Sequence, residues 1–202
     1  GEIATIFTES VGPWMMIVFI FGAFAEKAGV AEFFIDFSNS IAGHTMGGPA
    51  KVAIFSSALI GSVTGSTVAN VYTTGQFTIP MMKRLGYKPS IAGAIEALAS
   101  NGGQMMPPIM GAAAFILAAY SGVPYIEVAI ASLIPALLYF GGLFWFIHLE
   151  AHKTGLVGIP VEEKPSIMKV LLKGGHLVSP LLALIGCLIY GFSPVRAAFY
   201  AI

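Results

Sequence analysis

Charge is the property that this sequence has least of. Charged side chains make up 10% of its 202 residues, against 56% for hydrophobic ones, and ten basic residues balance ten acidic ones. A soluble domain carries about 25% charged residues. The chain has too few polar side chains to cover a globular surface, so we expect it to lie in a lipid bilayer. The absence of a basic patch argues against a nucleic-acid partner.

Cysteine and the signatures of enzymes are also scarce. The single Cys187 lies in an apolar run, so we expect a buried, inert thiol and no internal disulfide. Residues 61–65 have the spacing of a nucleophile elbow but carry Val63 at its centre, and the sequence has no P-loop, dinucleotide fingerprint or HExxH motif. His148 and His152 stand four apart at a helix end, where an interfacial role is favoured over a metal site. We expect no enzymatic activity and no cofactor.

A basic leader segment is missing as well. The chain begins Gly1-Glu2-Ile3, without the basic region of a signal peptide, and it ends inside the apolar run 199–202. We therefore expect both ends to be cut and the chain to be part of a longer permease.

Long apolar segments are what the sequence does have, and two of them are interrupted. The first covers residues 52–82, has basic residues at both ends, and is interrupted by the small residues 61–66. A continuous helix of this length would span about 45 Å, too long for a bilayer core of about 30 Å, while each arm alone is too short to cross. Positive charge at both ends favours the cytoplasmic side for both. A re-entrant helical hairpin fits these observations; the alternative is one long tilted helix with Gly61 and Gly65 as packing residues.

The second interrupted segment covers residues 91–120. Its apolar helix pattern is broken by Ser100–Gln104 and again by Pro107-Pro108 before it resumes. Backbone groups freed by such a break are tolerated in a bilayer only where they are buried in protein or line a wet site. A broken helix near the midplane is the best sequence indicator of a transporter's binding site. We therefore predict an all-α integral membrane protein with a discontinuous transmembrane helix, and a secondary transporter.

Both interruptions combine small residues with Ser, Asn or Gln oxygens. Carbonyl and hydroxyl oxygens can replace the water around Na⁺, and the N-termini of half-helices favour an anion. Brought together, the two would form a cation site and an anion pocket; the alternative is that they only pack helices and cap their ends. The residues expected to bind the ion, Na⁺, are Gly65, Ser66, Asn70, Ser100, Asn101, Gly102 and Gly103. Those expected to bind the substrate are Ser62, Ser66, Thr67, Thr74, Gln104, Pro107 and Pro108.

Glu96 is the only carboxylate within the broken helix. An acid inside a membrane costs about 2.5–3.5 kcal/mol on insertion scales, so a functional role is the default expectation. It lies four residues before Ser100, on the same helix face, where it would bind a cation or relay a proton. The alternative is an ion pair with Arg84 or Lys88 near the cytoplasmic end.

A family resemblance extends through both interruptions. Residues 61–115 are similar to the large membrane subunit of tripartite ATP-independent periplasmic (TRAP) transporters, closest to the fused permeases that work with TAXI-type binding proteins. FGAFAEKAGVAEFF and GGPAKVAIFSSAL also fit, so the resemblance covers most of the chain. Asn101 stands where Thr is common, and residues 118–120 stand where an Ala-Glu pair often follows. The run that carries the resemblance is GSVTGSTVANVYTTGQFTIPMMKRLGYKPSIAGAIEALASNGGQMMPPIMGAAAF.

The resemblance implies an elevator-type transporter in the inner membrane, with several crossings and with this chain as the first half of an inverted repeat. It implies Na⁺-driven uptake of small organic acids that a soluble periplasmic binding protein delivers. The remainder of the same permease, with a small-subunit-like region, would complete the assembly. By motif match, the hairpin tip Ser66–Asn70 and the break Ser100–Gly103 would form one sodium site and part of the substrate site.

The expected division of the chain follows from these segments. It comprises scaffold-type helices in 1–50, the re-entrant hairpin in 51–82, a linker with the discontinuous helix in 83–120, a transmembrane helix in 121–150, a cytoplasmic loop in 151–174, and a transmembrane helix with the start of the next in 175–202. In the first part, Glu32 and Asp36 lie four apart, where a wet or interfacial helix face is favoured over an ion site. Two other functions compete: an ion channel and a non-transporting membrane scaffold subunit.

Overall fold

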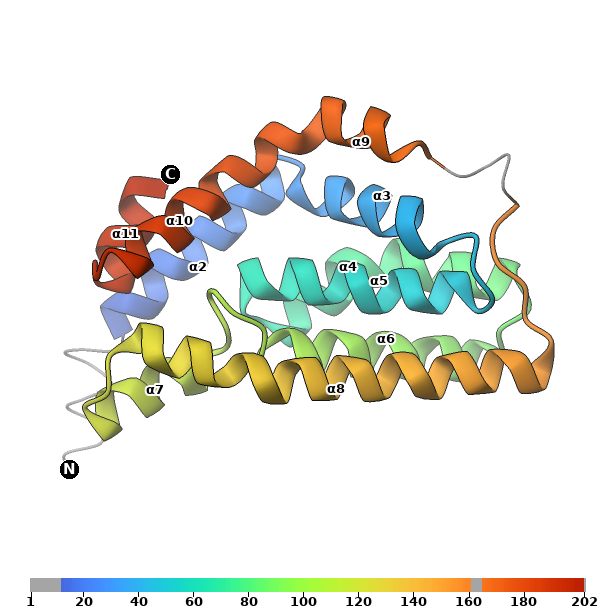
Figure 1. The fold of residues 1–202 in the computed structure, drawn as a ribbon, viewed down its shortest axis with the longest axis horizontal. Helices are drawn as coiled ribbons and strands as arrows, with labels where there is room; N and C mark the ends of the chain where they lie inside the picture. The colour runs from blue at the N-terminus through green and yellow to red at the C-terminus, as the bar shows by residue number, and fades with distance from the viewer. Residues whose placement is uncertain (1–11, 161–164, 202) are drawn as a thin grey trace.

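The computed structural model describes residues 12–160 and 165–201, and every regular element in those ranges is a helix. The all-α prediction is therefore confirmed for that part of the chain. Figure 1 shows α4, α5 and α6 running alongside the long α8, with α2, α10 and α11 gathered at one end and α9 lying over α3. The elements are α2 (Gly12–Lys27), α3 (Val30–Ala42), α4 (Gly48–Thr64), α5 (Thr67–Arg84), α6 (Pro89–Gly103), α7 (Ala112–Ser121), α8 (Tyr125–Thr154), α9 (Ile167–Gly174), η3 (Gly175–Val178), α10 (Ser179–Ile189) and α11 (Pro194–Ala201).

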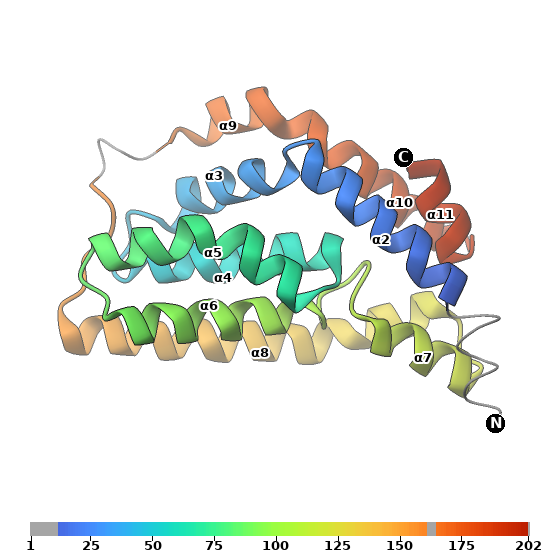
Figure 2. The same cartoon turned by 180° about the vertical axis from the view of Figure 1, so that it is seen from behind.

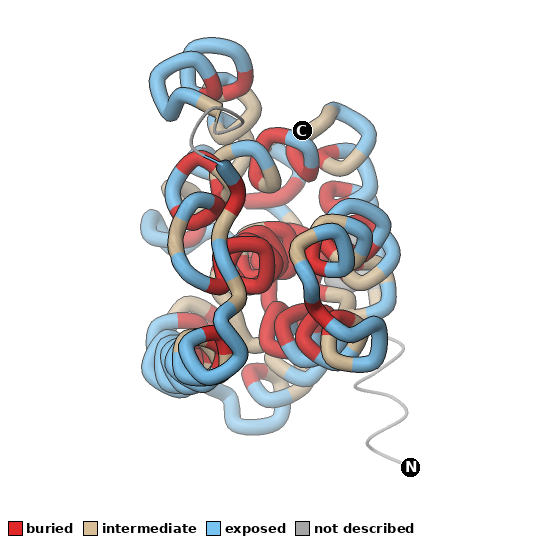
Figure 3. The backbone as a smooth tube through the Cα atoms, turned by 90° about the vertical axis from the view of Figure 1, so that its right-hand side faces the viewer, coloured by how far each residue is buried: buried red, intermediate tan, exposed pale blue. Residues whose placement is uncertain are grey.

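Helix α4 is enclosed by its neighbours. Its sequence has apolar or small residues on all sides, which is the pattern of a helix buried all round. All of its residues except Phe55 and Leu59 are buried, and α3, α5 and α6 pack against it. Ser56 satisfies its own hydroxyl by donating to the Val52 carbonyl at 2.8 Å. Figure 3 shows the buried backbone concentrated at the centre of the bundle.

Helices α4 and α5 form a hairpin, so the alternative of one long tilted helix is wrong. Gly65 ends α4 in the left-handed conformation, with φ +63°, and its amide donates to the Gly61 carbonyl at 2.9 Å. Ser66 is extended and caps α5 by accepting a hydrogen bond from the Ala69 amide at 3.4 Å. A left-handed glycine followed by a serine cap is the standard end and start of two successive helices.

Within the described residues, two segments are long and apolar enough to cross a membrane. They are α8, in which an 18-residue stretch has a mean hydropathy of 2.0, and Ile167–Ile189, in which such a stretch has 1.6. The second segment includes α9, η3 and α10. Helix α8 leaves large apolar side chains exposed along its length, such as Ile134, Leu138 and Phe146. A surface of this kind suits contact with lipid rather than water.

Helix α9 covers the acidic face of α3. Glu32 and Asp36 line a groove of about 260 Å³ together with Lys169 and Lys173 of α9. The acidic pair therefore faces basic side chains across a polar groove, in agreement with the wet helix face expected from the sequence.

Candidate functional site

The tip of the α4–α5 hairpin lies against the break that follows α6. The Ile109 amide donates to the Ser62 carbonyl at 3.1 Å, and Gln104 Nε2 donates to Thr67 Oγ1. These contacts join segments that lie about 40 residues apart in the sequence. Figure 2 shows the loop of the break beside the tip end of the hairpin. The predicted meeting of the two interruptions is confirmed.

The break itself starts later than the sequence predicted. Ser100–Gly103 were expected to be unwound, but they form the last turn of α6, and the non-helical residues are Gln104–Gly111. Nothing in Ser-Asn-Gly-Gly forbids helical backbone angles. Pro107 has no amide to continue the helical ladder, and a proline also disfavours the helical conformation of the residue before it, here Met106. The prolines, not the glycines, therefore decide where the helix ends.

Two glycines let α4 and α6 approach at backbone distance near the tip. A Cβ atom built on Gly61 would lie 2.4 Å from the Gly103 Cα atom, and one built on Gly103 would lie 2.8 Å from the Gly61 Cα atom. Asn70 of α5 lies against both glycines, with Nδ2 about 3 Å from either Cβ position. Its Nδ2 donates to the Ser57 carbonyl at 2.8 Å. Its Oδ1 is buried and has no hydrogen-bond partner among the described residues.

The structure brings together only part of the predicted site. Four of the residues expected at the ion lie at the hairpin tip or against it: Gly65, Ser66, Asn70 and Gly103. The other three do not, since Gly102 faces Tyr139 of α8, Asn101 is exposed, and the Ser100 hydroxyl donates to Glu96. Four of the residues expected at the substrate lie at the tip: Ser62, Ser66, Thr67 and Gln104. By contrast, Thr74 is buried beside Glu96. The two prolines, Pro107 and Pro108, line an apolar cavity against α8 and α10.

Glu96 is fully buried at the centre of a cluster of hydroxyls. Thr78 Oγ1 donates to its carboxylate at 2.5 Å, Ser100 Oγ at 3.1 Å and Ser57 Oγ at 3.4 Å, and Thr74 Oγ1 makes a fourth contact. The cluster joins both arms of the hairpin to α6. Sequence reasoning missed Ser57 and Thr78. The signal that was available is the i, i+4 spacing of Thr74 with Thr78, which puts both hydroxyls on one face of α5.

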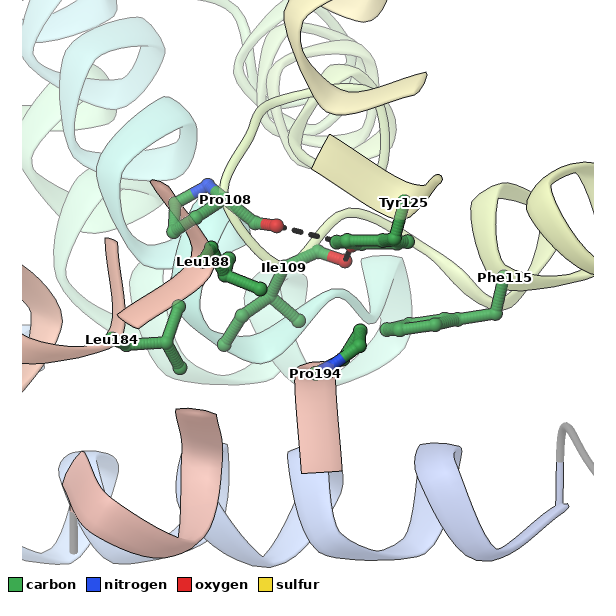
Figure 4. Close-up of a pocket in the computed structure, with 7 residues that line it drawn as sticks. All are labelled: Pro108, Ile109, Phe115, Tyr125, Leu184, Leu188 and Pro194. Atoms are coloured by element: carbon green, nitrogen blue, oxygen red, sulfur yellow. Dashed lines mark hydrogen bonds between the residues drawn. The ribbon is translucent and has the colours of Figure 1, made fainter. Parts of the chain in front are cut away.

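Tyr125, at the start of α8, holds the break from the other side. Figure 4 shows its hydroxyl directed at the non-helical backbone. It donates to the Pro108 carbonyl at 3.0 Å and also contacts the Ile109 carbonyl. Its ring stacks on Phe115 of α7, with centroids 4.6 Å apart. Nothing in the sequence marks this tyrosine, because it lies 16 residues beyond Ile109, whose carbonyl it contacts.

Replacing Tyr125 with phenylalanine is expected to lower the free energy of unfolding by about 1–2 kcal/mol, because buried carbonyls of the break lose their donor while the ring stack remains. Thermal unfolding in detergent micelles measures the change. Tyr139→Phe is the matched control, because the Tyr139 hydroxyl donates at 2.9 Å to the Leu98 carbonyl at an exposed position. Its expected cost is about 0.5 kcal/mol or less. Equal losses for the two variants would contradict a specific role for Tyr125.

The chain is similar to a known family of membrane transport proteins. Residues 9–202 match the family described as "Tripartite ATP-independent periplasmic transporter, DctM component". The chain is 32% identical over 139 residues to the C4-dicarboxylate TRAP transporter large permease protein DctM of Pseudomonas aeruginosa, covering 69% of this chain and 32% of the relative. It is 28% identical over 181 residues to the sialic acid TRAP transporter permease protein SiaT of Haemophilus influenzae, covering 89% of this chain and 29% of the relative.

A third relative has another solute in its name. The chain is 32% identical over 162 residues to the ectoine TRAP transporter large permease protein TeaC of Halomonas elongata, covering 77% of this chain and 36% of the relative. The chain thus spans about a third of the length of these curated relatives.

Proposed function

Because this chain belongs to the DctM family of TRAP transporter large permease subunits, we propose that it forms part of a sodium-coupled secondary transporter that imports small organic acids. In this proposal a TAXI-type periplasmic binding protein delivers the acid. The remainder of the permease, with a small-subunit-like region, completes a multi-pass assembly in the inner membrane. The chain supplies one hairpin and one broken helix to the moving part of an elevator-type transporter.

The observation that carries the proposal is the contact between the hairpin tip and the break. The arms of the hairpin have 17 and 18 residues, or about 26 Å each at 1.5 Å per residue, which is shorter than a bilayer core of about 30 Å. Two helical elements that end against each other, both short of a full crossing, support a re-entrant hairpin and a binding site near mid-membrane.

The donor set at this contact suits a sodium ion. Sodium takes neutral oxygen ligands, and the buried, unpartnered Asn70 Oδ1 is such a ligand without a use inside the described protein. The glycines Gly61 and Gly103 bring backbone close to the Asn70 side chain. We propose that Asn70 holds the coupling ion together with backbone oxygens of the hairpin tip and of the last turn of α6. Ser100 is less suited than the sequence suggested, because its hydroxyl is used by Glu96.

The substrate side of the proposal lies at the N-terminus of α5. Thr67 begins this helix, and the positive end of a helix favours an anion. Ser66 is half-buried there, and Gln104, which hydrogen-bonds to Thr67, is exposed. A small carboxylate would thus meet hydroxyl, amide and backbone donors, and the acid and the sodium ion would be bound next to each other.

Glu96 enters the proposal as a relay for a proton or a cation. Four hydroxyls surround its carboxylate, and the cluster also reaches Asn70, because Thr74 Oγ1 lies within hydrogen-bond distance of the Asn70 carbonyl, at 2.8 Å. If Glu96→Gln left uptake, its sodium dependence and its pH dependence all unchanged, this role would be excluded.

The test is uptake by the complete permease, reconstituted in liposomes with its binding protein. A panel of radiolabelled solutes that includes a C4-dicarboxylate, sialic acid and ectoine, taken from the relatives' names, identifies the substrate with and without a sodium gradient. Asn70→Ala is expected to lower sodium-driven uptake about tenfold or more, because the cation loses a buried ligand.

Gln76→Ala is the matched control, because Gln76 is exposed on the same helix. It is expected to keep uptake unchanged. Thermal unfolding of both variants separates loss of binding from loss of fold. Wild-type uptake that ignores the sodium gradient, or ion conductance without saturable uptake, would contradict the proposal; unchanged uptake in a folded Asn70→Ala protein would contradict the site.

A further inference from the structure

A small cavity between α2 and the C-terminal end of α4 contains polar groups that the proposed function does not use. Its walls are mostly apolar, but Glu26 of α2 and Thr64 of α4 also line it. Its volume of about 10 Å³ is roughly the space that one water molecule or small ion needs. Figure 2 shows α2 passing beside the tip end of the hairpin.

Thr64 brings an unused hydroxyl to the cavity. Its side chain is 8% exposed, and its Oγ1 is buried without a hydrogen-bond partner among the described residues. Threonine and serine in a helix usually bond back to the carbonyl one turn earlier, as Thr74 does to Asn70 at 2.8 Å. The Thr64 hydroxyl makes no such bond, so it is left to interact with whatever occupies the cavity.

The end of α4 adds an unused carbonyl. Two of its last carbonyls have donors: Gly61 accepts from the Gly65 amide at 2.9 Å, and Ser62 accepts from the Ile109 amide at 3.1 Å. The Val63 carbonyl has none within residues 12–160 and 165–201, and Val63 lines the cavity. This oxygen reaches the surface of α2, since a Cβ atom built on Gly22 would lie 3.0 Å from it.

The charges around the cavity are unbalanced. A helix C-terminus carries about half a negative charge, and Glu26 brings a full one to the end of α4. Thr73 of α5 fixes the Glu26 carboxylate by donating to it at 2.7 Å, but a hydroxyl does not compensate its charge. No basic side chain in the described part of the chain forms an ion pair with Glu26, and the adjacent Lys27 is exposed.

We propose that this cavity is a second sodium site, in which the Glu26 carboxylate, the Val63 carbonyl and the Thr64 hydroxyl hold one Na⁺ ion. All three ligands are oxygens, and one carboxylate matches one monovalent charge. A divalent cation would need more carboxylates, and no group of three or more metal-binding acidic, His or Cys side chains occurs among the described residues. A water molecule would form hydrogen bonds with the hydroxyl and the carbonyl, but it would not compensate the negative charge of the Glu26 carboxylate or of the C-terminus of α4.

An ion at this position would hold α2 against α4 of the hairpin. It is distinct from the proposed site at Asn70, which faces α6 through Gly103. The inference deepens the proposed function by adding a coupling ion, and to that extent it rests on sodium coupling. The binding of the ion itself does not depend on transport and is measured separately.

The experiment is equilibrium binding of radioactive Na⁺ to the purified complete permease, in detergent, against a choline background. Glu26→Gln is expected to bind one ion fewer than the wild-type protein over the same concentration range, because the only charged ligand is gone. Glu32→Gln, at an exposed carboxylate in the first turn of α3, is the matched control and is expected to bind the wild-type number. An unchanged number and affinity in Glu26→Gln would overturn the proposal.

The Thr64→Val variant provides a second test that stands even where Glu26→Gln fails to fold. Valine has nearly the same shape, so in choline the variant is expected to unfold at the wild-type temperature or slightly above, because a buried unpaired hydroxyl is removed. The sodium concentration that raises its unfolding temperature is expected to increase about tenfold. A sodium response equal to that of the wild-type protein would overturn the proposal. If uptake ignores sodium while Glu26→Gln still loses one bound ion, the proposed function fails and this site stands.

Discussion

Gly103→Ala is expected to destabilise the fold by about 3 kcal/mol and to abolish uptake. The added Cβ atom would lie 2.8 Å from the Gly61 Cα atom and 3.2 Å from the Ser57 carbonyl oxygen. Both are backbone atoms of α4, so no side chain can turn away to make room, and the helices must move apart. Overpacking of this kind costs about 1–3 kcal/mol and sometimes more. Gly61→Ala is expected to act in the same way, at 2.4 Å from Gly103.

The loss of uptake follows from the position of Asn70. Its Nδ2 would lie 2.9 Å from a Cβ atom on Gly103, so a wider helix pair moves the proposed ion ligand as well as the two backbones. Thermal unfolding in detergent and sodium-driven uptake by the reconstituted permease measure the two effects on the same preparation.

Gly93→Ala is the matched control on the same helix. A Cβ atom at Gly93 would meet nothing within 4 Å. Alanine is the better helix former by about 1 kcal/mol, so this variant is expected to be slightly stabilised and fully active. Equal behaviour of the Gly93 and Gly103 variants would show that α4 and α6 do not depend on close backbone contact.

The elements of the fold were largely predictable because Gly, Ser and Pro determine where helices end. Gly65-Ser66 separates α4 from α5 where the sequence suggested a hairpin tip, and α7 resumes after Pro107-Pro108 as expected. The error at Ser100–Gly103 has a local cause. The consecutive glycines Gly102 and Gly103 suggest unwinding in the sequence, but glycine only permits other conformations, whereas proline enforces them.

The side-chain clusters were much less predictable, because they depend on how three helices are rotated against each other. The sequence pointed to Asn70 and Glu96 separately. It did not indicate that Ser57 contacts Glu96 with its hydroxyl and Asn70 with its carbonyl, at 3.4 Å and 2.8 Å. Glu26 and Thr73 illustrate the same limit, since their hydrogen bond joins residues 47 positions apart. No periodic pattern along one helix contains such information.

Gly65→Ala is expected to have the second large effect, and its control separates two causes. Gly65 has φ +63°, and a Cβ atom there would lie 2.1 Å from the Met110 carbonyl oxygen. Gly155 has φ +68° but nothing within 4 Å of its Cβ position. The left-handed conformation costs an alanine about 1–2 kcal/mol at either position. Only the Gly65 variant adds the clash with backbone of the break.

We therefore expect Gly155→Ala to lower the free energy of unfolding by about 1 kcal/mol and keep uptake, and Gly65→Ala to lower it by about 4 kcal/mol and abolish uptake. Met110 itself has φ +59°, which is unusual for a residue with a side chain, so its carbonyl has little freedom to move away from Gly65. Thermal unfolding and uptake of the two variants, compared pairwise, measure the difference. A Gly65 variant no worse than the Gly155 variant would mean that the tip and the break touch without depending on each other, and an ion held between them would then lose its structural basis.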